Sequence, residues 1–285
     1  MDQRSAITRD GRRLTYGVVG AGPLLVCHPG GPGLSGAYLE DLAGLARTRT
    51  LVFVNPAGTG GSDPWAEEAY SLDVRAGGVD DLRAALAEER IDYLGHSAGG
   101  FVGVRYAARY PERVRRLLLV GTITRFTDDL RAALARQRRL HEHEPWFEDA
   151  VAAQGRRMAR EYADEAEFQA LYERAFPLMF ASYRQGEQEF MRRLRGTGLR
   201  CDRRTLDSFN DEAASFDLRP DLPRISAETL IVNGELDGVR ALERELLDAI
   251  PDARLAVIES AGHFPFVEQP ERFHGAVLEF LGVGE

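Results

Sequence analysis

Lysine is absent from the sequence, and all 36 strongly basic side chains of the 285 residues are arginines. This absence excludes a P-loop lysine, a Schiff-base lysine and a Ser-Lys catalytic pair. Cysteine is almost absent too. Cys27 and Cys201 are too few for a disulfide framework and are not spaced as a metal site, so we expect two reduced structural cysteines.

Long apolar runs, basic surfaces and cofactor motifs are also missing. No run of 18 apolar residues occurs, and the first 20 residues lack the apolar segment of a signal peptide. The formal charge of -9 argues against a nucleic-acid partner. The glycine clusters at 17–22 and 58–62 lack dinucleotide or P-loop spacing, and no His-Glu-x-x-His occurs. We therefore predict a cytoplasmic protein without metal, organic cofactor, nucleic-acid or membrane partner.

Short apolar runs alternate with helical patterns through most of the chain, after a start whose alternating residues and Asp10-Gly11 turn predict a hairpin. This order is typical of an α/β fold with a mostly parallel sheet that helices cover on both faces. The predicted buried strands are Leu24 to Cys27, Leu51 to Val54, Ile91 to Leu94, Leu117 to Val120, Leu230 to Val232 and Leu255 to Ile258. The predicted helices are Ala37 to Ala46, Leu72 to Glu89, Gly99 to Tyr110, Val239 to Ile250 and Glu271 to Leu281.

Residues 122–217 break this alternation. Amphipathic segments rich in Arg and Glu, such as Asp128 to Glu142 and Asp149 to Phe180, replace the buried strands there. We interpret residues 122–217 as a helical lid inserted into a core formed by residues 1–121 and 218–285.

The strongest motif is Gly95-His96-Ser97-Ala98-Gly99, a G-x-S-x-G sequence between a predicted strand and a predicted helix. In that context a serine is held at a sharp turn with its hydroxyl exposed above the sheet. The motif also occurs by chance as a glycine-rich turn with an incidental serine. Ser97 is therefore a candidate nucleophile that requires a base and an orienting acid.

His263 is the candidate base, because it follows the predicted strand Leu255 to Ile258 in a loop at the carboxyl edge of the sheet. His274 falls inside the last predicted helix, which favours a packing or surface role. His141 and His143 are two residues apart on a predicted helix and point in different directions. His28 and His96 precede the candidate nucleophile, against the expected chain order of Ser, acid and His.

Asp237 is the candidate acid, since it follows the predicted strand Leu230 to Val232 by a short loop. A carboxylate there can fix the tautomer of the imidazole and stabilise the imidazolium. Glu235 is the local alternative.

Two backbone N–H groups are candidates for holding an oxyanion. Ala98 directly follows Ser97, and Gly31 lies in the loop His28-Pro29-Gly30-Gly31-Pro32-Gly33. The loop also suits a plain turn or a phosphate cradle, although Pro32 interrupts it and no lysine follows.

Together these motifs resemble the α/β-hydrolase superfamily, in their order and over nearly the whole core. The resemblance implies the α/β-hydrolase fold with an inserted helical lid, and the triad Ser97, Asp237 and His263. The loop Gly30 to Gly33 is similar to that of the proline iminopeptidase branch.

The chain departs from that branch at positions that bear on the choice of substrate. The resemblance implies a Trp after the nucleophile, where this chain has Ala98, and in some members an acidic residue after the triad Asp, where it has Gly238. Proline iminopeptidases also hold the substrate amine with acidic residues, partly from the lid. The candidates for that role here are Glu173, Glu187, Glu189 and Glu212.

We therefore expect a serine hydrolase that cleaves an ester, lactone or thioester of a small carbonyl substrate. Release of N-terminal proline is the first alternative, and carbon–carbon bond hydrolysis and acyl transfer remain open because they use the same groups. A small-molecule receptor on this fold is the alternative that is not an enzyme. The sequence does not predict an oligomeric state.

Overall fold

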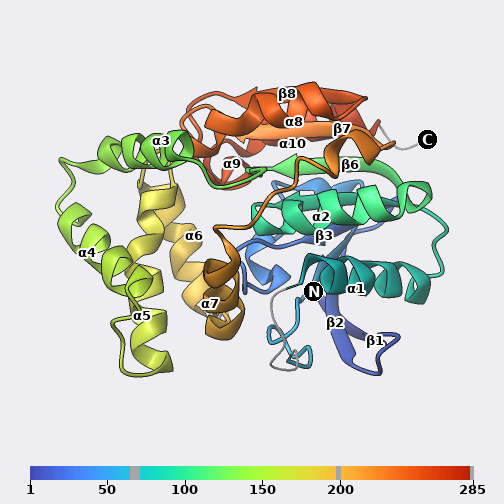
Figure 1. The fold of residues 1–285 in the computed structure, drawn as a ribbon, viewed down its shortest axis with the longest axis horizontal. Coiled ribbons are helices and arrows are strands. Elements are labelled where there is room, and N and C mark those ends of the chain that lie inside the picture. The colour runs from blue at the N-terminus through green and yellow to red at the C-terminus, as the bar shows by residue number, and fades with distance from the viewer. Residues whose placement is uncertain (65–70, 197–199, 283–285) are drawn as a thin grey trace.

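The computed structural model describes residues 1–64, 71–196 and 200–282, and a mostly parallel sheet runs through its centre (Figure 1). The sheet has eight strands in the order β1-β2-β4-β3-β5-β6-β7-β8. Strands β3 to β8 pair in parallel, whereas β2 is antiparallel to both β1 and β4. The strands are β1 (Asp2–Ile7), β2 (Arg13–Val19), β3 (Leu24–His28), β4 (Thr50–Val54), β5 (Ile91–His96), β6 (Val114–Val120), β7 (Glu228–Gly234) and β8 (Ala253–Ile258).

The N-terminal hairpin forms at the predicted turn. Ile7 of β1 pairs with Arg13 of β2, and Gly11 in the turn has a φ of 82°. The N–H of Thr8 donates to the carbonyl of Arg12 at 2.8 Å, which closes the loop. The Asp10-Gly11 prediction is therefore confirmed.

The two large apolar clusters among the described residues lie on opposite faces of the sheet. Alternate residues of β3 show the division, because Val26 belongs to one cluster and Leu25 and Cys27 to the other. The first cluster includes side chains of α1 (Leu72–Ala85), α2 (Ala98–Arg109) and α8 (Glu243–Ala249), and the second includes side chains of α10 (Pro270–Leu281). The predicted sheet with helices on both faces is confirmed.

A helical insertion lies between β6 and β7, at the end of the sheet where the parallel strands finish (Figure 1). Its limits at residues 122 and 217 stay a prediction. The α-helices described in it are α3 (Asp128–Arg138), α4 (Phe147–Met158), α5 (Glu165–Ala175), α6 (Gln185–Gly196) and α7 (Arg203–Glu212).

The predicted helix from Ala37 to Ala46 is wrong. The chain forms two short 3-10 helices there, η1 (Gly36–Leu39) and η2 (Leu45–Arg47). Between them Leu42 and Ala43 have φ values of 47° and 57°, which a right-handed helix does not allow. Leu42 is fully buried, so tertiary packing outweighs the local helical pattern.

Two other predicted helices are interrupted. The segment from Asp149 to Phe180 breaks between α4 and α5, where Arg160 has a φ of 58°. The segment from Val239 to Ile250 begins as a 3-10 helix and becomes α8 only at Glu243. In both places the sequence predicts helical structure correctly, but it does not predict the interruption of the helix.

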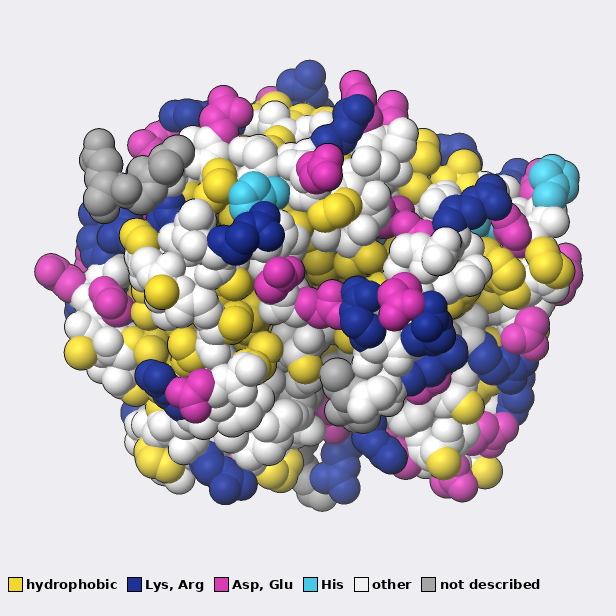
Figure 2. All heavy atoms as spheres, turned by 180° about the vertical axis from the view of Figure 1, so that it is seen from behind, with side chains coloured by type: hydrophobic (Ala, Val, Ile, Leu, Met, Phe, Trp, Pro, Cys, Tyr) yellow, Lys and Arg dark blue, Asp and Glu magenta, His cyan; other side chains and the backbone are white. Residues whose placement is uncertain are grey.

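The surface carries charges of both signs. Figure 2 shows arginine and acidic side chains next to one another over the face behind Figure 1, with apolar side chains between them. Ion pairs such as Arg193 with Glu40 at 2.7 Å and Arg125 with Glu245 at 2.5 Å are part of this pattern. Within the described ranges, no helix is long and apolar enough to cross a membrane.

Candidate active site

Ser97 lies at the turn between β5 and α2, with a φ of 53° and a ψ of -118°. This backbone conformation is rare for a residue with a side chain. The N–H of Ser97 donates to the carbonyl of Val120 at 2.7 Å, which fixes the turn against β6. A Cβ on Gly99 would lie only 2.2 Å from the carbonyl oxygen of His28, so the turn needs a glycine there. The structure therefore places Ser97 at the strained strand-to-helix turn that the motif predicts.

Asp237 and His263 meet at the same edge of the sheet. They follow β7 and β8, and Oδ2 of Asp237 lies 2.7 Å from Nδ1 of His263. Both side chains are buried. The alternative acid, Glu235, is exposed, and its Oε2 accepts from the N–H of Ser260 instead. Of the two carboxylates, only Asp237 is hydrogen bonded to His263.

The pair sets the proton position on His263. Because a carboxylate only accepts, Nδ1 of His263 carries the hydrogen in this bond and Nε2 of the neutral ring is left as an acceptor. Burial lowers the pKa of His263, but the charge of Asp237 and the hydrogen bond to it raise this pKa above its usual value. His263 thus has an unprotonated nitrogen for taking a proton and a carboxylate that stabilises the charged ring.

Gly121 makes room for this pair. It follows β6 with a φ of 61°, and its N–H donates to Val232 at 3.0 Å. A Cβ at this position would lie 3.0 Å from Cε1 of His263 and 3.5 Å from Oδ2 of Asp237. The absence of a side chain at Gly121 therefore lets the imidazole lie against the backbone.

A chain of hydrogen bonds joins the loop of Gly30 to the backbone of His263. The N–H of Gly30 donates to the hydroxyl of Tyr38 at 2.7 Å, and this hydroxyl lies 2.6 Å from Nδ1 of His96. Nε2 of His96 lies 2.8 Å from the carbonyl oxygen of His263. A carbonyl only accepts, so Nε2 of His96 donates, Nδ1 accepts, and the Tyr38 hydroxyl donates to Nδ1. Burial and then the nearby His263 lower the pKa of His96 well below its usual value, which fits a neutral ring.

The same hydrogen bonds bear on the candidate oxyanion donors. The N–H of Gly30 is engaged by Tyr38, whereas the N–H groups of Gly31 and Ala98 have no acceptor among the described residues. Ala98 is the first residue of α2, whose N-terminal end favours negative charge. Gly31 and Ala98 therefore stay the predicted donors, and the structure gives a reason to prefer Gly31 over Gly30.

The remaining histidines have structural partners or face solvent. Nδ1 of His28 lies 3.0 Å from the carbonyl of Pro29, and Nδ1 of His274 lies 2.9 Å from that of Ala43. His141 is buried with Nε2 at 2.9 Å from the carbonyl of Phe180, while the side chain of His143 is 93% exposed.

The sequence interpretation missed two polar residues that hold the loops of the site. Gln137 on α3 accepts from the N–H of Gly238 at 2.9 Å and donates to the carbonyl of Met179 at 3.0 Å. Glu268, the last residue of α9 (Pro265–Glu268), accepts from backbone N–H groups on both sides of His263. An acidic residue directly after the apolar run Phe264 to Val267 was the available signal for Glu268.

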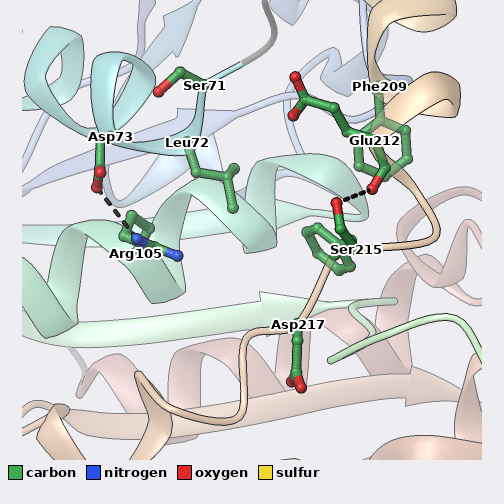
Figure 3. A pocket seen from close by; sticks show the side chains of 9 residues that line it. Ser71, Leu72, Asp73, Arg105, Phe209, Glu212, Ser215 and Asp217 are labelled. Atoms are coloured by element: carbon green, nitrogen blue, oxygen red, sulfur yellow. Dashed lines mark hydrogen bonds and ion pairs between the residues drawn. The ribbon is translucent and has the colours of Figure 1, made fainter.

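A separate cavity of about 370 Å³ lies where α7 approaches α1 and α2 (Figure 3). Arg105 pairs with Asp73 at 3.3 Å on one side, and Ser215 donates to the carbonyl of Glu212 at 2.9 Å on the other. None of Ser97, Asp237 and His263 lines this cavity. Figure 3 therefore shows a polar recess outside the predicted reaction site.

The residues described in the structure contain no group of three or more His, Cys, Asp or Glu side chains placed to hold a metal ion. Both cysteines are free and buried. The absence of a metal or organic cofactor stays a prediction from the sequence.

Known proteins resemble the chain over almost its full length. A 2-hydroxymuconate semialdehyde hydrolase from Pseudomonas sp. (strain CF600) is 28% identical over 92% of this chain and 88% of its own. The solved structure of the esterase RhEst1 from Rhodococcus sp. ECU1013 matches with a TM-score of 0.78 at 25% identity, over 100% of both chains. That of an enol-lactonase from Burkholderia xenovorans LB400 matches with a TM-score of 0.74 at 25% identity, over 98% of this chain and 99% of its own.

The expected proline iminopeptidase branch has weaker support. A proline iminopeptidase from Mycobacterium smegmatis is one structural neighbour, with a TM-score of 0.69 at 21% identity over 98% of this chain and 97% of its own, and this likeness concerns the fold alone. The model of the alpha/beta hydrolase fold family matches residues 23–270. The chain belongs to the α/β-hydrolase family and is a hydrolase, as the sequence predicts.

Proposed function

We propose that this hydrolase cleaves an ester, lactone or thioester of a small molecule through Ser97, His263 and Asp237. The 2.7 Å hydrogen bond between His263 and Asp237 carries the proposal, because it leaves an accepting nitrogen on a buried imidazole. The strained turn at Ser97 supports it, since that turn presents a hydroxyl at the carboxyl edge of the same sheet.

In the proposed reaction Ser97 attacks the substrate carbonyl while Nε2 of His263 takes the hydroxyl proton. The N–H groups of Gly31 and Ala98 donate to the oxyanion, and Asp237 stabilises the imidazolium. His263 then gives its proton to the leaving oxygen or sulfur, and an acyl-enzyme forms. Water attacks this intermediate with His263 again as base, which releases the acid and restores Ser97.

The ester class is favoured over N-terminal proline by the surroundings of the site. Two solved structures at 25% identity are described as an esterase and an enol-lactonase. Two of the lid carboxylates considered for holding a substrate amine are paired with arginines, Glu173 with Arg195 at 2.9 Å and Glu189 with Arg192. Gly238 offers no acidic side chain beside Asp237.

Carbon–carbon bond hydrolysis is the second candidate. It is favoured by the similarity to the 2-hydroxymuconate semialdehyde hydrolase, which extends over 92% of this chain. The same base, acid and oxyanion donors serve either reaction. Acyl transfer differs only in the acceptor that attacks the acyl-enzyme.

A fluorophosphonate probe tests the nucleophile. We expect wild type to be labelled at Ser97, and Ser97→Ala to lose labelling and at least about 10⁴-fold in kcat while its circular dichroism spectrum is unchanged. Ser5→Ala, at an exposed serine on β1, is the matched control and should be labelled as wild type. Failure of wild type to react would overturn the proposal.

The substrate class is tested by comparing kcat/KM for an aryl ester, an enol lactone, a prolyl arylamide and a vinylogous diketone acid. Highest values for the ester or lactone support the proposal. Efficient cleavage of the prolyl amide with weak esterase activity would reverse the order of the first two classes. Preference for the diketone acid would favour carbon–carbon bond hydrolysis.

A further inference from the structure

Glu268 is a half-buried carboxylate whose two oxygens accept hydrogen bonds from three backbone N–H groups. Oε2 accepts from Ala181 at 2.7 Å and from Gly262 at 3.0 Å. Oε1 accepts from Gly262 at 3.0 Å and from Phe264 at 3.1 Å. Gly262 and Phe264 flank His263, whereas Ala181 belongs to the helical insertion. A single side chain thus joins two segments more than 80 residues apart in the sequence.

The segment Phe176 to Ala181, which we call the strap, lies directly against the loop of His263. The N–H of His263 donates to the carbonyl of Met179 at 3.0 Å. A Cβ on Gly262 would lie 2.5 Å from the backbone nitrogen of Ala181, so the two backbones touch. The rings of Phe176 and Phe180 lie 5.1 Å and 5.0 Å from that of Phe264. The strap therefore contacts the backbone of the predicted base directly and packs aromatic rings against the next residue, Phe264.

We propose that Glu268 is a positioning residue that fastens the strap to the loop of His263 and thereby holds the helical insertion against that loop. The part of this inference that concerns catalysis rests on the proposed function of Ser97 and His263. Glu268 acts through backbone N–H groups and does not touch the reacting atoms.

The chemistry of the contact requires a carboxylate. Both oxygens of Glu268 accept, and each is within 3.1 Å of two N–H groups. A glutamine has one accepting oxygen, and its NH₂ would face N–H donors at the other position. Glu268→Gln therefore keeps the size of the side chain. It loses either the hydrogen bond to Ala181 in the strap or a hydrogen bond to the loop of His263.

Hydrogen exchange above pH 7, where Glu268 is ionised, measures this contact without reference to activity. In Glu268→Gln we expect the amides of Ala181, Gly262 and Phe264 to exchange about tenfold faster, in the strap and the loop together. The control is Glu271→Gln, at an exposed glutamate three residues along the same region, which should exchange as wild type. Unchanged exchange at all three amides of Glu268→Gln would overturn the inference.

Kinetics on an aryl ester measure the consequence for His263. Glu268→Gln should lose about 100-fold in kcat with a smaller change in KM, because displacing the base by about 1 Å affects the transition state. Glu268→Asp keeps both accepting oxygens and should recover part of the loss. Faster exchange with unchanged kcat would disprove the positioning role. Failure of wild type to react at Ser97 would instead overturn the proposed function, and hydrogen exchange alone would then decide whether Glu268 fastens the strap.

Discussion

Nε2 of His96 lies 2.8 Å from the carbonyl oxygen of His263, so the residue before the predicted nucleophile holds the backbone of the predicted base. Nδ1 of the same ring accepts from Tyr38, whose hydroxyl also accepts from Gly30 beside the predicted oxyanion donor. One neutral imidazole thus connects the loop of the predicted base, the turn of the predicted nucleophile and the loop of the predicted oxyanion donor.

Removing the Tyr38 hydroxyl should break this connection. Tyr38→Phe leaves the Gly30 N–H and Nδ1 of His96 buried without a partner, which costs about 1 to 3 kcal/mol of unfolding free energy. We expect kcat on an aryl ester to fall about tenfold or more with little change in KM, because the oxyanion loop loses its support. Urea unfolding and steady-state kinetics measure both effects. Tyr110→Phe is the control, and equal kinetics in the two variants would contradict the role of Tyr38.

The identity of the acid can be tested by isosteric amides. Asp237→Asn should lower kcat about 10⁴-fold with little change in fold, because an amide no longer selects the tautomer with the hydrogen on Nδ1 of His263. Glu235→Gln should retain activity, since Glu235 is exposed and bonds to Ser260. A larger loss in Glu235→Gln than in Asp237→Asn would show that the assignment is wrong.

A methyl group at Gly121 should directly disturb the hydrogen-bonded pair of Asp237 and His263. Gly121→Ala adds a Cβ 3.0 Å from the His263 ring at a φ of 61°, so we expect about 1 to 2 kcal/mol of destabilisation together with lower kcat. Gly275→Ala on α10 is the matched control, because that position has open space and ordinary helical backbone. This control should be stabilised by about 0.5 to 1 kcal/mol, with kcat unchanged. Full activity in Gly121→Ala would contradict the close packing.

The pH dependence of kcat/KM should report on His263. Burial lowers its pKa, but Asp237 and, to a smaller extent, Glu268 together raise this pKa above the usual 6.5, and only the neutral ring acts as base. Activity should therefore rise with pH through a midpoint above 6.5 in wild type. The residual activity of Asp237→Asn should show a lower midpoint, because the raising interaction is lost. A midpoint at or above the wild-type value in that variant would contradict this cause.

Stability should depend on pH through Glu268. Burial raises its pKa from 4.5 to about 7 although the N–H groups of Ala181, Gly262 and Phe264 lower it, and the charged groups that interact with it are Glu187 on α6 and His263. A carboxyl with a raised pKa stabilises the folded state fully below pH 4.5, and this contribution is lost as the pH rises through about 7. Relative to Glu268→Gln, wild type should lose about 3 kcal/mol of unfolding free energy over that range. If the unfolding free energies of wild type and Glu268→Gln changed with pH in parallel, this result would contradict the raised pKa of Glu268.

Much of the fold follows from local patterns in the sequence. Buried strands such as Leu24 to Cys27 appear as apolar runs, because a parallel strand is covered on both faces. The G-x-S-x-G motif predicts the turn at Ser97 because only glycine fits the close approach of backbones there. The meeting of Asp237 and His263 follows from their places after adjacent parallel strands.

Other features depend on contacts that sequence spacing does not encode. The segment Ala37 to Ala46 has a helical pattern, yet its leucines are buried by tertiary packing that requires left-handed backbone at Leu42. The bond between His96 and His263 spans 167 residues, and that between Glu268 and Ala181 spans 87. No periodicity links such distant positions, so these contacts are found only in the folded chain.

The strap ties the helical insertion to the loops of the predicted acid and the predicted base. Met179 supplies the carbonyl that receives the N–H of His263, and Gln137 joins the same carbonyl to the loop after Asp237. A different insertion grafted between β6 and β7 would therefore have to bring its own acceptor at the position of Met179. In this chain a change in the insertion is also a change in the support of the His263 loop, so under the proposed function substrate recognition and reactivity would not change independently.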